Sequence, residues 1–227
     1  MVPTGVVVVT DRHQAVAPLP EQVAAAVAGG ARWVWLREKD LPAPERAALA
    51  AELREVLAPV GGRLMVSGPQ PPVLSGAQPS MVSGAQPPWG DALHLSAADP
   101  PVTAHRAAAE GLAVGRSCHT AADLARLGDE HYVTLSPVFP SASKPGYGPP
   151  LGLSRLAELC RHAGRPVLAL GGIETPARAQ ACVTAGAVGV AVMGAVMRAA
   201  DPAALVRTLV AGVAVGTRYA IAGAVVG

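Results

Sequence analysis

Short apolar runs alternate with longer segments of helical spacing along most of this chain. The runs have the length of strands and are rich in β-branched residues, whereas the segments between them are rich in alanine and leucine. Strands are predicted at Val6–Val9, Trp33–Arg37, Leu64–Val66, Ala92–Leu95, Ala113–Gly115, Tyr132–Ser136, Val167–Leu170 and Val190–Met193. Helices are predicted at Glu21–Ala28, Glu45–Leu57, Thr103–Glu110, Ala121–Leu127, Leu153–His162, Pro176–Thr184 and Ala203–Val213.

The near-continuous apolar character of these strands is typical of a parallel sheet that is buried on both faces. Eight strand–helix units in about 215 residues predict one α/β domain, a parallel (β/α)8 TIM barrel. A doubly wound open sheet is the alternative, but it usually carries a glycine fingerprint after its first strand. Here that strand is followed by Thr10-Asp11-Arg12-His13. We therefore assign residues 1–214 to the barrel and residues 215–227 to a C-terminal tail.

The segment after the third predicted strand breaks the alternation. Three copies of one motif, spaced by eight residues, begin at Ser67, Ser75 and Ser83, and the last reads Ser-Gly-Ala-Gln-Pro-Pro. So many prolines and glycines exclude a regular helix, so residues 67–90 are predicted to form an insertion loop. Duplication within an exposed loop is the simpler interpretation, because long surface insertions cost little entropy. A lid over the pocket is the alternative.

Composition excludes several classes of protein. A net charge of +2 with scattered basic residues offers no patch for nucleic acid. Cys118, Cys160 and Cys182 form no Cys-x-x-Cys pair, which fits a reducing compartment and neither a disulfide framework nor a zinc site. The N-terminus lacks the pattern of a signal peptide, and Arg207 and Arg218 interrupt the apolar tail. We expect a cytoplasmic protein that has no membrane partner.

In a parallel barrel the chemistry lies at the C-terminal ends of the strands. The last two predicted strands end in glycine turns, Gly171-Gly172-Ile173 and Met193-Gly194. Bare backbone N–H groups at such turns can bind a phosphate, and the loops after strands 7 and 8 form the phosphate site of many barrels. Glycines that merely permit tight turns are the structural alternative. The turns indicate a small phosphate ester as ligand.

Polar side chains also follow the strands, and several suit a ligand with a carboxylate or phosphate. Arg37 and Lys144 are candidate partners for such an anion, Arg37 through a bidentate fork. His119 is a candidate proton carrier, since an unperturbed imidazole titrates near ~6.5. The structural alternatives are a helix-capping role for His119 and a hydrogen-bonded structural role for His94. The candidates at the strand ends are Asp11, Arg37, Glu38, Lys39, Ser67, His94, Asp99, Arg116, Ser117, His119, Ser136, Ser141, Ser143 and Lys144.

Taken together, these stretches resemble the superfamily of thiamine phosphate synthases and TenI-type thiazole tautomerases, which are TIM barrels. The resemblance runs in consistent order from about Val6 to Val213. It implies an enzyme of thiamine biosynthesis that binds a thiazole phosphate through Arg37, Lys39, Ser117, Ser141, Ser143 and Lys144. The matching stretches are Val9-Thr10-Asp11-Arg12, Leu36-Arg37-Glu38-Lys39, His94-Leu95 with Asp99, Gly115-Arg116-Ser117-Cys118-His119-Thr120, the segment from Ser136 to Lys144, Ala169-Leu170-Gly171-Gly172-Ile173 and Val190-Ala191-Val192-Met193-Gly194.

Two departures distinguish between the activities of this superfamily. The resemblance implies that synthases carry Gln-x-Arg-x-Lys on the second strand and Asn-Asp-Arg after the third. It also implies that this aspartate and another after the fourth strand hold magnesium on a pyrophosphate. Here Trp35 replaces the glutamine, and the third strand runs into Ser67 and Gly68. Only Asp99 remains as a metal ligand, which leaves a weak magnesium site unless Asp11 or Glu38 is recruited.

The tautomerases, as the resemblance implies, aromatise a thiazole carboxylate phosphate by moving a proton and use no metal. We therefore predict a tautomerase-like enzyme in which His119 carries the proton and no cofactor is needed. A thiamine phosphate synthase with a rearranged magnesium site is the first alternative. A non-catalytic barrel that binds thiazole phosphate or thiamine phosphate for regulation is the second. A homo-oligomer is left open.

Overall fold

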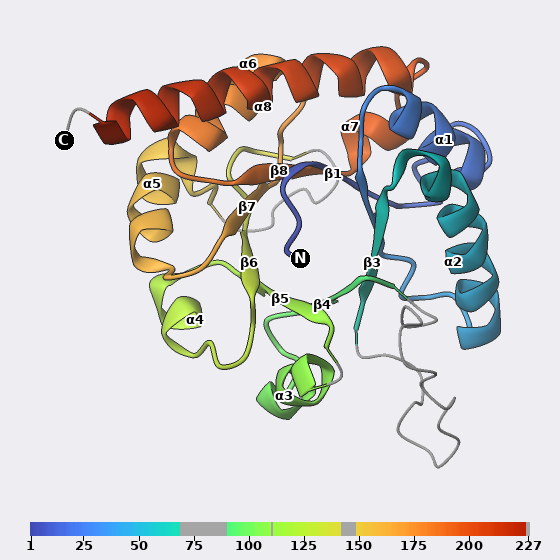
Figure 1. The fold of residues 1–227 in the computed structure, drawn as a ribbon, viewed down its shortest axis with the longest axis horizontal. Helices are drawn as coiled ribbons and strands as arrows, with labels where there is room; N and C mark the ends of the chain where they lie inside the picture. The colour runs from blue at the N-terminus through green and yellow to red at the C-terminus, as the bar shows by residue number, and fades with distance from the viewer. Residues whose placement is uncertain (69–89, 110, 142–148, 226–227) are drawn as a thin grey trace.

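The computed structural model describes residues 1–68, 90–109, 111–141 and 149–225. Its centre is a closed barrel of parallel strands that follow chain order, so that β8 pairs with β1 (Figure 1). The predicted (β/α)8 barrel is confirmed, and the open sheet is excluded. The strands are β1 Gly5–Val9, β2 Trp33–Leu36, β3 Arg63–Ser67, β4 Ala92–Leu95, β5 Ala113–Cys118, β6 Tyr132–Leu135, β7 Val167–Leu170 and β8 Gly189–Val192.

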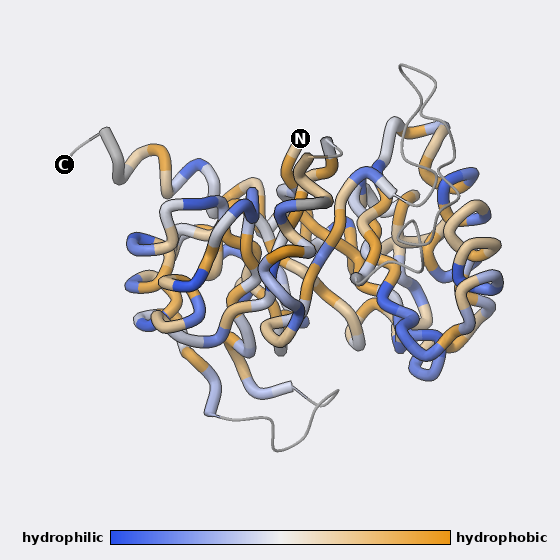
Figure 2. Tube along the Cα trace, turned by 90° about the horizontal axis from the view of Figure 1, so that it is seen from below, coloured by the Kyte–Doolittle hydropathy of each residue, from blue (hydrophilic) through white to orange (hydrophobic). Residues whose placement is uncertain are grey.

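Helices surround the barrel, and the apolar stretches are concentrated along the strands in the middle of the molecule (Figures 1 and 2). One large cluster of buried side chains lies between strands and helices, and a second fills the barrel itself. The helices are α1 Leu19–Ala28, α2 Ala43–Leu57, the 3-10 turn η1 Ala58–Val60, α3 Pro101–Ala109, α4 Ala121–Ala125, α5 Gly152–His162, α6 Pro176–Thr184, α7 Gly194–Met197 and α8 Pro202–Val225.

The last helix differs most from prediction, because α8 continues to Val225 through the segment that was assigned to a tail. Its Gly212 and Gly216 lie against α6, where a Cβ on Gly212 would stand 2.3 Å from the Pro176 carbonyl oxygen. This close approach lets the glycine-containing stretch pack as a helix. The stretch Pro202–Ala222 could cross a membrane by length and composition alone, but one such helix is weak evidence for a membrane span.

The interior of the barrel is filled around Tyr132, which is fully buried on β6. Gly115 on the neighbouring strand β5 makes room for it, because a Cβ on Gly115 would stand 2.2 Å from the tyrosine ring. Trp33 and Trp35 of β2 belong to the same interior cluster. The barrel is therefore a packed core, and ligand chemistry is restricted to its mouth.

Two predicted features lie outside the described residues. Most of the insertion loop predicted at residues 67–90 falls there, as do Ser143 and Lys144. The loop, the lid and the ligand contacts of these two side chains stay predictions, and so does the domain boundary at residue 214.

Candidate active site

Polar side chains from five neighbouring strands meet inside the mouth of the barrel. On β2 and β3, the Trp35 Nε1–H donates to Ser67 Oγ at 2.9 Å. On β4 to β6, His94 Nε2 lies 3.1 Å from Ser117 Oγ and 3.4 Å from Thr134 Oγ1. Trp35, Ser67, His94 and Thr134 are buried, whereas Ser117 is half-buried. Ser117 is therefore the member of this group through which the buried polar cluster reaches the mouth.

His94 is held in its neutral form. The pKa of His94 is lowered to about 3, mainly by burial and also by the charges of Lys39 and Arg116. Its ring packs 4.1 Å from the Trp35 ring, measured between centroids, and its Nδ1 lies 3.4 Å from the Tyr132 hydroxyl. These contacts agree with the structural interpretation of His94. Lys39 itself follows the C-terminal end of β2.

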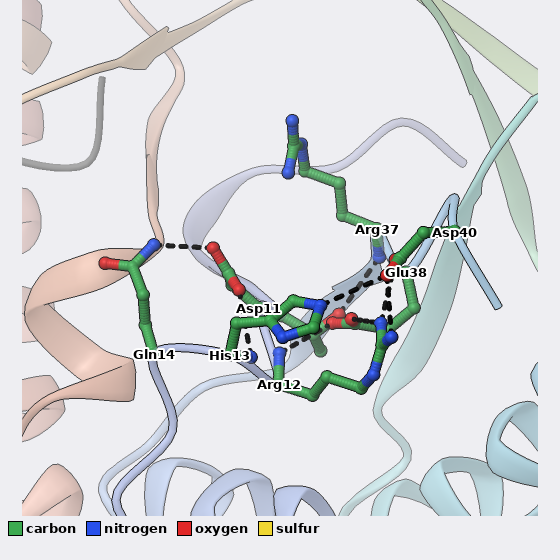
Figure 3. Close-up of polar contacts among 8 residues, drawn as sticks. Asp11, Arg12, His13, Gln14, Arg37, Glu38 and Asp40 are labelled. Carbon is green, nitrogen blue, oxygen red and sulfur yellow. Dashed lines mark hydrogen bonds and ion pairs between the residues drawn. The ribbon is translucent and has the colours of Figure 1, made fainter. Parts of the chain in front are cut away.

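The charges that follow β2 are not paired with one another. Glu38 and Asp40 instead bind Arg12 from the loop after β1, at 3.1 Å and 2.6 Å (Figure 3). The Arg37 side chain points away from this cluster in the same view. Within the part of the chain that the structure describes, neither Arg37 nor Lys39 has an ion-pair partner. Two cations are thus left to attract an anionic ligand to the mouth.

The carboxylates near the mouth are each engaged in a contact within the chain. Asp11 accepts a hydrogen bond from Gln14 Nε2 at 2.5 Å and closes its own turn, and Glu38 is buried in the ion pair with Arg12. Asp99 Oδ2 accepts from the Ser96 N–H at 2.6 Å. Among the described residues, no group of three or more His, Cys, Asp or Glu side chains could hold a metal. Magnesium bound mainly through protein carboxylates is not supported by this set of donors.

The turn that carries Asp99 is braced by a buried ion pair. Arg116 Nε donates to Glu130 Oε1 at 2.5 Å, and its Nη1 donates to the carbonyls of Ser96 and Asp99 at 3.0 Å and 2.6 Å. Burial alone would raise the pKa of Glu130, but hydrogen bonds from Arg116 and a backbone N–H outweigh it and lower the pKa below its ordinary value. Arg116 was a candidate from the sequence, but Glu130 was not, because it lies in the loop before β6 and its partner lies on β5.

His119 follows β5 and has a defined tautomer. Its Nδ1 lies 2.7 Å from the Ser136 carbonyl oxygen, and because a carbonyl only accepts, Nδ1 carries the proton. The lone pair of the neutral ring is therefore on Nε2. Helix α4 is capped by Thr120 and Asp123, which form a reciprocal capping box. The His119 imidazole does not cap this helix, although its backbone N–H joins the cap by donating to Asp123 Oδ2 at 2.9 Å, so the catalytic role of the imidazole stays a prediction.

The turn after β7 is shaped by its glycines. Gly171 and Gly172 have φ values of +103° and +66°, which other residues rarely adopt. A Cβ on Gly172 would stand 2.3 Å from the Pro140 carbonyl oxygen, and the Phe139 N–H donates to the Gly171 carbonyl at 3.1 Å. Arg178 Nη1 donates to the Gly172 carbonyl at 2.6 Å. Both glycines are required by the turn itself, so phosphate binding there stays a prediction.

The other predicted contacts lie in the adjoining loops. Ile173 is buried beneath the turn after β7, and Met193 and Gly194 lead from β8 directly into α7. Ser141 is half-buried in the loop after β6. The barrel topology places the β7 and β8 loops side by side, because these strands are hydrogen-bonded neighbours.

Cys118 lies beside His119 in the sequence but is not a nucleophile. Its side chain is fully buried, and burial raises the pKa of its thiol to about 12. A thiol with that pKa is protonated at neutral pH and unreactive. The burial of Cys118 agrees with a role in packing the core.

A closed parallel eight-stranded barrel with polar side chains gathered at the C-terminal ends of its strands has the architecture of the (β/α)8-barrel enzymes. Residues 6–196 match the family described as thiamine monophosphate synthase (TMP-TENI), and the chain belongs to this family. This confirms the resemblance predicted from the sequence and makes the chain a member of a thiamine biosynthesis family.

Individual proteins that are similar to this chain support the same assignment. The chain is 37% identical over 208 residues to the thiamine-phosphate synthase of Roseiflexus sp. (strain RS-1), covering 90% of this chain and 83% of that protein. It is 35% identical over 187 residues to the thiamine-phosphate synthase of Methanoculleus marisnigri, covering 81% and 82%. A thiamine phosphate pyrophosphorylase from Pyrococcus furiosus has the same fold, with a TM-score of 0.76, 24% identity, and 94% and 97% of the two chains covered.

Proposed function

We propose that this chain is a thiazole phosphate isomerase of thiamine biosynthesis, which aromatises its substrate by moving a proton without a metal. The observation that carries this proposal is the hydrogen bond between Trp35 and Ser67. These residues occupy the positions at which the resemblance implies the glutamine and the Asn-Asp pair of the synthases. A fold hosts different reactions according to its site residues, so these positions weigh more than overall similarity.

The chain's own residues supply what a proton transfer requires. Arg37 and Lys39 follow β2 at the mouth, have no ion-pair partners among the described residues, and can bind the carboxylate of the substrate. The glycine turns after β7 and β8 can bind the phosphate. His119 Nε2 can accept the proton, and the Ser136 carbonyl then stabilises the imidazolium through Nδ1–H. The same imidazole can return the proton to another atom of the substrate.

Thiamine phosphate synthesis is the second candidate, and the comparisons favour it over the isomerase. The named relatives are thiamine-phosphate synthases that match this chain over most of its length. This reaction joins a pyrimidine diphosphate to a thiazole phosphate and releases pyrophosphate. The same cations could bind the diphosphate, but the carboxylates described above do not form the magnesium site that the resemblance implies for the synthases.

Two assays on the purified full-length chain separate these activities. The first follows the ultraviolet absorbance of a thiazole carboxylate phosphate as it becomes aromatic in buffer that contains EDTA. The second measures pyrophosphate release from a pyrimidine diphosphate and thiazole phosphate at saturating magnesium. We expect turnover in the first and none in the second. The opposite pattern overturns the proposal in favour of the synthase, and tight binding without turnover in either assay overturns it in favour of a binding protein.

A further inference from the structure

One amide side chain from the first βα unit holds the last loop of the barrel. Gln22 of α1 is 3% exposed. Its Nε2 donates to the carbonyls of Val196, Met197 and Ala199 at 2.8, 3.1 and 3.0 Å. All three partners can only accept, so the orientation of the amide is fixed by its surroundings.

The carbonyls of Val196 and Met197 belong to the end of α7, and that of Ala199 lies two residues beyond it. Helix α7 is a single turn, Gly194–Met197, and so short a helix is not stable by itself. A further hydrogen bond to α7 comes from the loop after β1, where the Val16 N–H donates to the Met197 carbonyl at 3.1 Å. Contacts from the β1–α1 unit therefore help to fix the conformation of α7, together with the burial of Val196 and Met197 in the core. Because α7 begins directly after Met193, these contacts also fix the loop that follows β8.

We propose that Gln22 is a positioning residue for the substrate phosphate, acting through the loop Met193–Gly194. The inference rests on the proposed function in one respect, namely that this loop binds the phosphate. It does not depend on which reaction follows, since both candidate reactions use a thiazole phosphate. Gln22 itself touches α7 and not the ligand.

Loss of the amide is expected to alter this loop and to leave the barrel intact. Strand β8 is held by its own ladders to β1 and β7. Helix α1 stays anchored by Val23, Ala26 and Val27, which are buried in the core. A variant at position 22 should therefore weaken recognition of the phosphate and not that of the thiazole ring.

The test compares Gln22→Met with the wild-type chain by isothermal titration calorimetry. The two probes are hydroxyethylthiazole phosphate and the same thiazole alcohol without the phosphate. We expect the phosphate ester to bind about tenfold more weakly to the variant, which corresponds to ~1.4 kcal/mol. Affinity for the alcohol should not change. Gln180→Met makes the same chemical change on α6 and should change neither affinity.

Equal losses for both probes, or no loss for either, would overturn the inference, because a general packing defect does not distinguish the phosphate. If the wild-type chain binds the alcohol as tightly as the ester, the phosphate site itself is wrong and the proposed function fails with it. An isomerase assay that fails while Gln22→Met still loses affinity only for the ester overturns the proposed reaction alone. Gln22→Leu, which also removes the donor and adds no charge, serves the same comparison if the methionine variant does not fold.

Discussion

The buried ion pair between Arg116 and Glu130 connects the stability of the barrel to its active face. The two side chains are 8% and 2% exposed. In Glu130→Gln the shape of the side chain is retained and its charge is lost. Arg116 then keeps a buried charge without a counter-ion, and its Nη2 is already buried without a hydrogen bond. Removal of one partner from such a pair costs about 3–5 kcal/mol.

The same pair has a predictable pH dependence. The pKa of Glu130 is lowered in the folded chain, so the unfolded chain binds its proton more readily. The stabilisation by Glu130 is therefore complete above its unfolded pKa of about 4.3 and is lost as the pH falls through the lower folded pKa. The difference between the wild-type chain and Glu130→Gln should be large at pH 7 and smaller in acid.

Urea denaturation followed by circular dichroism at pH 7 and in acid measures both effects. Glu158→Gln is a matched control, because its pair with Arg155 is exposed on α5 and contributes little. We expect the control to unfold like the wild-type chain. A loss below about 1 kcal/mol for Glu130→Gln, or an equal loss at both pH values, would refute the reasoning.

Three further predictions concern the interior and the mouth of the barrel. Gly115→Ala should destabilise the chain by about 3 kcal/mol in urea denaturation, because its Cβ would stand 2.2 Å from the Tyr132 ring; an unchanged midpoint would contradict this. With the pKa of His94 at about 3, the unfolded chain takes up its proton first, so melting temperature should fall as the pH drops from 6.5 towards 3, and less so in His94→Gln. Dialysis against EDTA should leave affinity for the thiazole phosphate unchanged, since the described residues offer no cluster of three metal ligands; a loss restored by magnesium would argue for the synthase.

The order of strands and helices could be predicted from the sequence, because strands buried on both faces leave a clear apolar signal. Strand β5 shows the limit of that signal. It was predicted to end at Gly115 but extends to Cys118. Arg116 and Ser117 are polar residues of the kind found in loops, and they fit the strand only because Glu130 and His94 are their partners. Such partners are set by the closure of the barrel and not by local sequence.

In the candidate site, too, residue types could be predicted from the sequence but their contacts could not. The tautomer of His119 could not be predicted, since it depends on the carbonyl of Ser136, which directly follows β6. The pairing of Glu38 with Arg12 also joins two loops that are distant in the sequence. Gln22 gave no signal, because its three partners are backbone carbonyls from the other end of the chain. Contacts of this kind become visible only in the folded barrel.

In the proposed reaction, His119 moves a proton in this pocket without a metal. The most direct test is single-turnover aromatisation of the thiazole carboxylate phosphate in EDTA, comparing wild type, His119→Gln and the surface control His105→Gln. We predict a loss of about 100-fold or more for His119→Gln with binding retained, in line with general acid–base catalysis, and no loss for His105→Gln. Equal rates for wild type and His119→Gln, or a rate that requires added magnesium, would show that His119 does not carry the proton in a metal-free reaction.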